Sequence, residues 1–353
     1  MRVLIAPDSF GDTLTAVAAA EAIARGWLTG RPDDEVVRAP QSDGGPGFVS
    51  VLADRFGTLH TETVAGPLGA SVQAQWLLDD RDPDHLVAYI ECAQACGLHQ
   101  LGGRPTPRTA IAADTVGVGQ LLDAALRAGA STVLVGLGGS ATTDGGRGLI
   151  DALGGTDAAM SRCRDVTIIA ASDVENPLLG PLGAAAVFGP QKGADPDTVA
   201  QLEERLTHWS RVLADMAGGD LSQTEGAGAA GGLGAVLLAL GGRRVPGASV
   251  VADATDRDAQ VADADLLITG EGRFDSQTLR GKVVSALTAA ARESSVPTVV
   301  VAGQVTLAPE EIAHAGISAA YSLVDHAGSV RLAMDDAANQ LTSMVRGVAA
   351  AWE

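Results

Sequence analysis

The sequence predicts an α/β protein in which helices connect the strands of a parallel sheet. Short apolar runs recur along the chain, and each ends in Gly, Asp or Ser before a helix-like pattern begins. Hydrophobic residues make up 46% of the chain but aromatic residues only 3%, so Ala, Val, Leu and Ile must build the core. The 44 glycines suit many tight strand-to-helix turns. With 353 residues, the chain is long enough for two domains.

Six apolar runs are typical of buried parallel strands, whose two faces are both covered by helices. These runs are residues 3–6, 36–39, 132–137, 166–171, 266–269 and 298–302. A helix is expected at 15–28, capped by Thr13 or Thr15, and another at 119–127, ended by Gly129. In such sheets ligands bind beyond the carboxyl ends of the strands, and the polar loops of this chain fall there.

Residues 61–110 follow a different pattern. Residues 72–78 alternate between polar and apolar, a polar turn follows at 79–84, and 85–92 are again mostly apolar. This arrangement predicts a hairpin and therefore antiparallel pairing. We accordingly expect one sheet domain formed by both chain ends, residues 1–60 and 265–353, with a second domain of residues 61–264 inserted into it.

Charge and cysteine usage limit the partners and the compartment. The formal charge of −19 disfavours nucleic acid and anionic membranes as partners. Cys92, Cys96 and Cys163 form no regular framework, which favours a cytoplasmic protein with reduced thiols. Cys92 and Cys96, with His99 nearby, are either half a metal site or two buried helix cysteines. The N-terminal apolar run is too short for a signal peptide, and no run reaches the ~20 residues of a membrane span.

The chain contains only two lysines, Lys192 and Lys282, and each lies in a glycine-flanked polar loop. Lysine is a compact point charge that fits beside a phosphate in a tight space, whereas arginine is a planar fork with five donors. We interpret both lysines as candidate phosphate ligands. The alternative is that a GC-rich genome favours arginine codons and that two lysines remain by chance.

Two glycine-rich segments, 136–146 and 226–234, are nearly free of side-chain bulk. Such loops can bring backbone N–H groups close to a phosphate. For the first segment, the alternative is a tight turn that lets helix and sheet approach; for the second, it is a close helix crossing through small residues. The first segment follows an apolar run, and its hydroxyl side chains could add further donors.

Acidic residues gather at the ends of the apolar runs. They are Asp8, Asp43, Asp144, Asp173, Glu271 and Asp275. Carboxylates at one sheet edge can hold Mg²⁺ together with waters, and one of them can act as a general base. Each acid taken singly is equally typical of a helix cap or a turn. In the stretch 270–282, Arg273 could grip a carboxylate and Lys282 could neutralise a phosphate, or the stretch is a surface ion-pair cluster.

At these loops the sequence resembles the bacterial glycerate kinase family that includes the type I glycerate 2-kinases. The matching segments, in family order, are Ala6-Pro7-Asp8-Ser9-Phe10 and residues 40–45, 136–146, 172–180, 187–193, 226–234 and 268–282. The resemblance implies a flavodoxin-like parallel sheet domain with a second mixed α/β domain inserted. It also implies ATP-dependent phosphorylation of D-glycerate with Mg²⁺, and the 2-phospho product is favoured over the 3-phospho product.

Roles follow from this resemblance. The expected catalytic residues are Asp43, Asp275, Arg273 and Lys282. The expected cofactor-binding residues are Gly138, Gly139, Ser140, Thr142, Asp144, Gly145, Lys192 and Gly228. The expected metal ligands are Asp8, Asp173 and Glu271. The partners would be ATP and a small hydroxy acid, and a homodimer is left open.

Two loops depart from the family pattern. The family usually has lysine directly after Phe10, where this chain has Gly11 and Asp12, and glutamate where this chain has Pro46. Two alternatives to glycerate phosphorylation therefore remain. One is a family member that phosphorylates a different small hydroxy acid, and the other is a catalytically degenerate relative that binds nucleotide.

Overall fold

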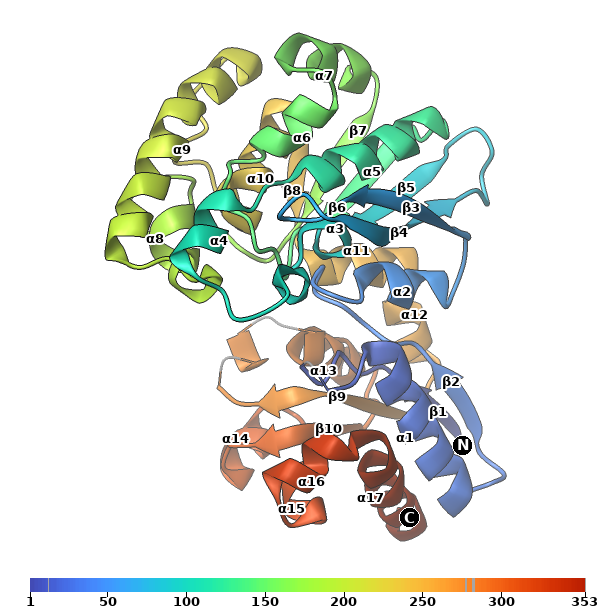
Figure 1. Ribbon diagram of the computed structural model, residues 1–353. Coiled ribbons are helices and arrows are strands. Elements are labelled where there is room, and N and C mark those ends of the chain that lie inside the picture. The colour runs from blue at the N-terminus through green and yellow to red at the C-terminus, as the bar shows by residue number, and fades with distance from the viewer. Residues whose placement is uncertain (12, 277, 281–282, 353) are drawn as a thin grey trace. The chain divides into compact units, whose positions relative to one another are not determined.

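A computed structural model describes residues 1–11, 13–276, 278–280 and 283–352 (Figure 1). The chain divides into two compact units, Met1–Asp43 with Val251–Glu353, and Gly44–Val250. The second unit is therefore inserted between the two halves of the first. Within the described part of the chain, no helix combines the length and the apolar character needed to cross a membrane.

The first unit alternates strands and helices. Its elements are β1 (Arg2–Ile5), α1 (Ala16–Gly30), β2 (Glu35–Arg38), α12 (Arg257–Ala262), β9 (Leu266–Phe274), the 3-10 helix η3 (Thr278–Arg280), α13 (Val283–Glu293), β10 (Thr298–Val305), α14 (Pro309–His314), β11 (Ala319–Ser322), α15 (Leu323–Ala327), α16 (Val330–Asp335) and α17 (Ala337–Ala351). Of the two expected caps, Thr15 is the one that caps α1, because its hydroxyl accepts from the Ala18 N–H at 3.1 Å.

The first unit contains a parallel five-stranded sheet in the order β11-β10-β9-β1-β2. Read from the other edge, this is the flavodoxin-like order, in which the strand order reverses beside the first strand. The predicted fold class, a flavodoxin-like sheet domain with an inserted mixed α/β domain, is confirmed. The structure adds β11, which was not expected from the sequence.

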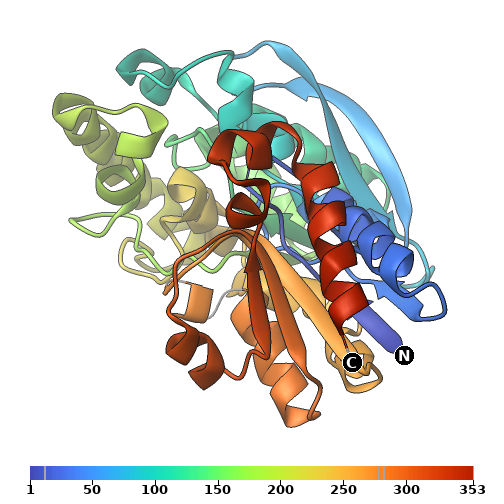
Figure 2. The same ribbon diagram turned by 90° about the horizontal axis from the view of Figure 1, so that it is seen from below.

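Both faces of this sheet are covered, and one strand shows how. On β10, Val299 and Val301 pack with α1 and α17, whereas Val300 and Ala302 pack with α13 on the other face. This strand therefore reads as a continuous apolar run. Helices α1 and α17 lie side by side (Figure 2). A Cβ on Gly26 of α1 would lie 2.5 Å from the Thr342 carbonyl oxygen, so glycine allows the two backbones to approach.

The second unit has more helices than strands. Its elements are α2 (Phe48–Ala53), β3 (Thr58–Ala65), β4 (Ser71–Asp79), β5 (Val87–Glu91), α3 (Ala93–Cys96), η1 (Leu98–Leu101), α4 (Pro107–Ala112), α5 (Val116–Arg127), β6 (Thr132–Gly136), α6 (Arg147–Ala152), α7 (Thr156–Cys163), β7 (Thr167–Ala171), α8 (Ala184–Phe188), η2 (Pro190–Lys192), α9 (Pro196–Ala217), α10 (Ala229–Ala239) and β8 (Arg243–Val245). Helix α11 (Gly247–Ala254) contains the boundary with the first unit.

Two short helices lie on the other side of the predicted domain boundaries at 60/61 and 264/265. Helix α2, placed by sequence in the first domain, packs against β4 and β5 of the second unit. Helix α12, placed in the inserted domain, packs against α13 of the first unit. Composition does not change at either crossing, so only these packing contacts define where the chain leaves one unit for the other.

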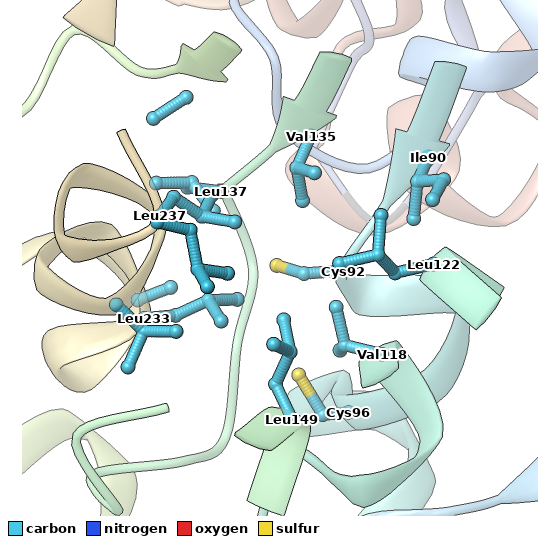
Figure 3. Close-up of a cluster of buried hydrophobic side chains, with 14 of the residues drawn as sticks. Ile90, Cys92, Cys96, Val118, Leu122, Val135, Leu137, Leu149, Leu233 and Leu237 are labelled. Carbon is cyan, nitrogen blue, oxygen red and sulfur yellow. The ribbon is translucent and has the colours of Figure 1, made fainter. Parts of the chain in front are cut away.

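The second unit contains a mixed six-stranded sheet in the order β3-β4-β5-β6-β7-β8. Strands β3, β4 and β5 pair antiparallel, which confirms the predicted hairpin, and β5 to β8 pair parallel. Figure 3 shows part of the core of this unit, where Cys92 and Cys96 lie among Val118, Leu122 and Leu149. Both cysteines are buried, as expected for helix cysteines in a core.

The second glycine-rich segment begins α10 with a left-handed turn. Ala230, Gly231 and Gly232 have φ angles of 50°, 68° and 96° before the regular helix continues. This turn packs on the first glycine-rich loop, since the Gly145 N–H donates to the Gly231 carbonyl at 3.0 Å. A Cβ on Gly231 would lie 1.9 Å from the Thr142 carbonyl oxygen. The small residues therefore serve a close crossing of two backbone segments.

A matched pair of substitutions tests this crossing. Gly231 and Gly241 both have φ in the left-handed region, but nothing lies within 4 Å of a Cβ built on Gly241. We expect Gly241→Ala to lower the free energy of unfolding by about 1–2 kcal/mol, the cost of the left-handed conformation. Gly231→Ala should lower it by about 3 kcal/mol more, because it also overpacks against backbone. Urea unfolding measures both losses, and equal losses would contradict the close crossing.

Candidate functional site

In the first unit, acidic side chains lie at the carboxyl edge of the parallel sheet. Backbone pairing continues beyond β1, because the Asp8 N–H donates to the Gly270 carbonyl at 2.8 Å. Asp8, just after β1, and Glu271, within the neighbouring strand β9, therefore lie at one edge, and both are half-buried. The Ser9 N–H donates to Asp8 Oδ1 at 2.6 Å, which orients that carboxylate.

The segment after β2 reaches the same edge. The Gln41 N–H donates to the Pro7 carbonyl at 2.9 Å, and the buried Gln41 amide donates to the Ala39 carbonyl at 2.9 Å. These bonds fix the chain up to Asp43, which is half-buried. Three of the predicted acids, on the segments after β1 and β2 and within β9, thus share one sheet edge.

Arg273 and Asp275 lie at the end of β9, where the strand extends past the edge. Arg273 Nε is 3.3 Å from Asp275 Oδ2, and the Asp275 N–H donates to Thr278 Oγ1 at 3.3 Å. The Arg273 side chain is 64% exposed, and an ion pair this exposed contributes little to stability. Stability alone therefore does not explain the placement of the pair. Lys282, the fourth predicted catalytic residue, lies outside the described residues.

The carboxylates at this edge fit the requirements of Mg²⁺. In the described residues, no three His, Cys, Asp or Glu side chains gather around one point. Magnesium is commonly held by only one or two carboxylates, with waters and substrate phosphate oxygens completing its octahedron. Asp8 and Glu271, on adjacent segments, provide such a pair of side chains.

In the second unit, the first glycine-rich loop is covered by another part of the chain. A Cβ on Gly138 would lie 2.4 Å from the Gly45 Cα, and one on Gly139 would lie 2.6 Å from the Pro46 Cγ. The Gly138 N–H also donates to the Gly44 carbonyl at 3.2 Å. Close approach of the Gly45 backbone and of the Pro46 ring is thus sufficient to explain the two glycines. Phosphate binding by Gly138 and Gly139 stays a prediction.

Lys192 is buried, with its ammonium group inside the second unit. Its Nζ donates to Ser140 Oγ at 3.0 Å and to the Thr142 carbonyl at 2.6 Å. Burial lowers the pKa of the Lys192 ammonium to about 8, although nearby Cys96, Cys92 and Asp144 favour its charged form. The lysine therefore holds the glycine-rich loop from within, and a direct contact with phosphate stays a prediction.

Asp144 is a buried carboxylate that organises the loop around it. Its Oδ2 accepts from the Thr115 N–H at 2.9 Å, from the Thr115 hydroxyl at 2.7 Å and from the Gly148 N–H at 3.1 Å. Its Oδ1 accepts from the Gly146 N–H at 3.0 Å. With four protein donors, Asp144 acts in this structure as the cap of the segment that begins α6.

The remaining predicted residues of the second unit are also in contact with backbone. Gly145 donates from its N–H to the crossing segment, and its carbonyl accepts from Trp209 Nε1 at 2.9 Å. A Cβ on Gly228 would lie 2.2 Å from the Pro177 carbonyl oxygen. Asp173 follows β7, is exposed, and accepts from the Gly247 N–H at 3.1 Å. Among these three residues, only Asp173 presents an exposed side chain.

Glu91 is a residue that the sequence analysis did not single out. It is the last residue of β5 and only 2% exposed, and its Oε2 accepts from the Gly47 N–H at 3.0 Å and the Val49 N–H at 3.3 Å. Burial raises the pKa of Glu91 to about 7, although these backbone hydrogen bonds favour the charged form. An acid at the end of an apolar run was the available signal, the same signal that identified the other acids.

The stability of the protein should depend on pH through Glu91. Its ordinary pKa is 4.5, and in the folded protein it is about 7. Between these values the folded state keeps a proton that the unfolded state has lost, so the contribution of Glu91 to stability falls as pH rises. The free energy of unfolding of E91Q, relative to that of wild type, should therefore rise by up to about 1.4 kcal/mol for each pH unit across this window. Urea unfolding at several pH values measures the difference, and a constant difference would contradict the expectation.

Comparison with known proteins places these features in a family. The glycerate kinase family profile matches residues 3–160 and 155–353, which together span nearly the whole chain. The chain is 39% identical to a glycerate kinase of Bacillus subtilis, covering 99% of this chain and 97% of the relative. It is 35% identical to a glycerate 2-kinase of Escherichia coli, with the same two coverages.

Two further comparisons agree with this placement. An uncharacterized protein of Mycobacterium tuberculosis is 58% identical over 99% of this chain and 91% of its own length. A crystal structure of a candidate glycerate kinase 2 from Salmonella typhimurium LT2 superposes with a TM-score of 0.79 at 35% identity, covering 99% of this chain and 97% of that chain. The predicted resemblance is confirmed, and the chain belongs to the glycerate kinase family.

Proposed function

We propose that this protein transfers the terminal phosphoryl group of ATP to the 2-hydroxyl of D-glycerate, giving 2-phosphoglycerate and ADP. The observation that carries the proposal is the match to the glycerate kinase family over nearly the whole chain, together with the acids at the carboxyl edge of the first sheet. Relatives named as glycerate kinases align over nearly their full length, so neither unit is missing from this chain.

The proposed reaction needs few covalent roles from the protein. The glycerate hydroxyl oxygen bonds to the terminal phosphorus, the bond from that phosphorus to the bridging oxygen breaks, and ADP leaves with the electron pair. The hydroxyl proton passes to Asp275 or Asp43. Positioning and charge neutralisation supply most of the acceleration in reactions of this class. These roles suit the half-buried acids at the sheet edge.

Charged side chains of the first unit complete the proposed arrangement. The guanidinium of Arg273 can bind the glycerate carboxylate through two parallel hydrogen bonds, and Lys282 would neutralise the transferred phosphoryl group. Asp8 and Glu271 would hold Mg²⁺; when bound, the ion neutralises charge on the phosphate oxygens.

In the second unit we propose that most predicted nucleotide residues act by giving the glycine-rich loop its shape. Lys192 donates to the Ser140 hydroxyl and to the Thr142 carbonyl, and Asp144 accepts from backbone N–H groups. Backbone N–H groups of the loop would then form the surface that receives the phosphates of ATP.

A second candidate function keeps the fold and the chemistry but changes the acceptor. Pro46 stands where the family usually has glutamate, and its ring lies against the backbone of Gly139. A rigid apolar ring in this loop favours an acceptor with a different polar group from that of glycerate. A panel of small hydroxy acids would separate the two functions.

Phosphate transfer provides the direct test. Purified protein with ATP, Mg²⁺ and D-glycerate should release ADP, and ³¹P NMR of the product should show the 2-phospho isomer. Omission of glycerate controls for ATP hydrolysis. Turnover with another hydroxy acid but not with glycerate would favour the second candidate, and no turnover by folded protein with any acceptor would refute both.

Asp275 and Asp335 give a matched pair for the catalytic assignment. Each forms an ion pair with an arginine at similar distance, 3.3 Å to Arg273 and 3.2 Å to Arg331, but Asp335 pairs within helix α16, and both side chains of that pair are exposed. We expect D275N to lower kcat by about 100-fold, the usual effect of losing a general base. D335N should leave kcat unchanged. Equal activity in the two variants would remove Asp275 from the reaction.

A further inference from the structure

Glu91 holds a segment of the second unit that begins directly after Asp43. This buried glutamate pairs with Gly136 in the parallel register of β5 and β6. Its carboxylate accepts from the N–H groups of Gly47 and Val49, at the start of α2. The two ends of this contact are distant in sequence, so the carboxylate fixes the segment 44–49 onto the sheet.

The segment held by Glu91 has an irregular backbone at the start of α2. Gly47 has a φ of 99°, in the left-handed region, and no side chain caps α2 from within its own sequence. The other face of the segment lies on the glycine-rich loop, where the Gly44 carbonyl accepts from the Gly138 N–H and the Pro46 ring contacts Gly139. The backbone of 44–47 is thus fixed between a carboxylate and a glycine backbone.

An ionised side chain at this position is costly for the fold. Burying a carboxylate in a low-dielectric interior is unfavourable unless its hydrogen bonds compensate, and here burial outweighs them, as the raised pKa of Glu91 shows. A neutral side chain would avoid that cost. Residues that lower stability in this way are characteristic of functional sites.

The charged groups around Glu91 do not offer it a counter-ion. Helix α2 and strand β6 contain no titratable side chain. Strand β4 contributes Asp79, which pairs with Arg81, and helix α5 contributes Asp123 and its partner Arg127. Cys92, next in sequence, is a thiol whose pKa its hydrogen bond to Cys96 and burial raise, so it remains neutral. The backbone N–H groups are therefore the partners that stabilise the charged Glu91 carboxylate, while burial dominates its pKa.

We propose that Glu91 is a positioning residue of the phosphotransfer reaction. Its carboxylate fixes the backbone that directly follows Asp43, and this anchors the acid that orients the acceptor hydroxyl. The inference rests on the proposed function, because the role of Asp43 does. The clamp itself, a carboxylate holding segment 44–49, does not depend on the substrate and can be measured separately.

Hydrogen exchange tests the clamp without any assay of activity. E91A should increase the exchange rate of the Gly47 and Val49 amides at least tenfold, and E91Q should give a smaller increase. E203Q is the matched control, because Glu203 also accepts from a backbone N–H, that of Gly180 at 2.6 Å, on a different part of the unit. E203Q should leave exchange in 44–53 unchanged. If these two amides exchanged in E91A at the rate measured in the wild type, the clamp would be refuted.

Kinetics test the positioning role. In the wild type, kcat should fall as pH decreases below about 7, because the protonated Glu91 binds the two amides less well. E91Q mimics the protonated state, so the fall of kcat at acidic pH should disappear. Its kcat at pH 8 should be about tenfold lower than that of the wild type. The KM for ATP should stay within twofold of wild type. If E91Q kept both the kcat of the wild type and its fall at acidic pH, the positioning role would be refuted.

The outcomes also separate this inference from the function on which it rests. If the wild type transfers phosphate to no acceptor, the proposed function fails and the positioning role fails with it, whereas exchange still decides the clamp. If the wild type is active and E91Q behaves like E203Q in both measurements, the inference alone is refuted. Thermal unfolding of E91Q and E203Q at pH 8 verifies that both variants are folded.

Discussion

Backbone-to-backbone packing of glycine segments is the constraint on which the second unit depends. Residues 44–46 lie on Gly138 and Gly139, and the left-handed turn at Gly231 lies on Thr142. At these contacts a Cβ would come within 1.9 to 2.6 Å of another part of the chain, closer than any side chain allows. Apart from the Pro46 ring, packing this close leaves little room for apolar side chains, so the hydrophobic effect contributes little at these contacts.

Buried polar side chains provide hydrogen-bond partners for the backbone groups at these glycine contacts. Backbone N–H and C=O groups in irregular segments must find partners when they are removed from water. Lys192 donates to the Thr142 carbonyl, while Asp144 and Glu91 accept from N–H groups of Gly146, Gly148, Gly47 and Val49. Each is an ion that burial alone would disfavour, and each is retained because it satisfies groups that no secondary structure can satisfy.

The sequence was a good guide to the strands and a poorer guide to the loops. Apolar runs such as 266–269 and 298–302 predicted buried parallel strands, and Thr15 was one of two expected caps for α1. The glycine-rich composition of segment 136–146 suits the approach of a phosphate and of another backbone equally well, so the sequence does not distinguish the two. Likewise, the glycines flanking Lys192 do not reveal that it is buried, with partners at Ser140 and Thr142 some fifty residues away.

The two units therefore differ in how their acids are placed, although one sequence pattern identified all of these acids except Glu91. In the first unit, Asp8, Glu271 and Asp275 are half-buried near the carboxyl edge of the parallel sheet. In the second unit, Asp144 and Glu91 are buried and their oxygens accept from backbone N–H groups. Under the proposed function, a change in the first group would remove a chemical participant, whereas a change in the second would alter the shape of a loop. Exposure, which the sequence does not encode locally, separates these two roles.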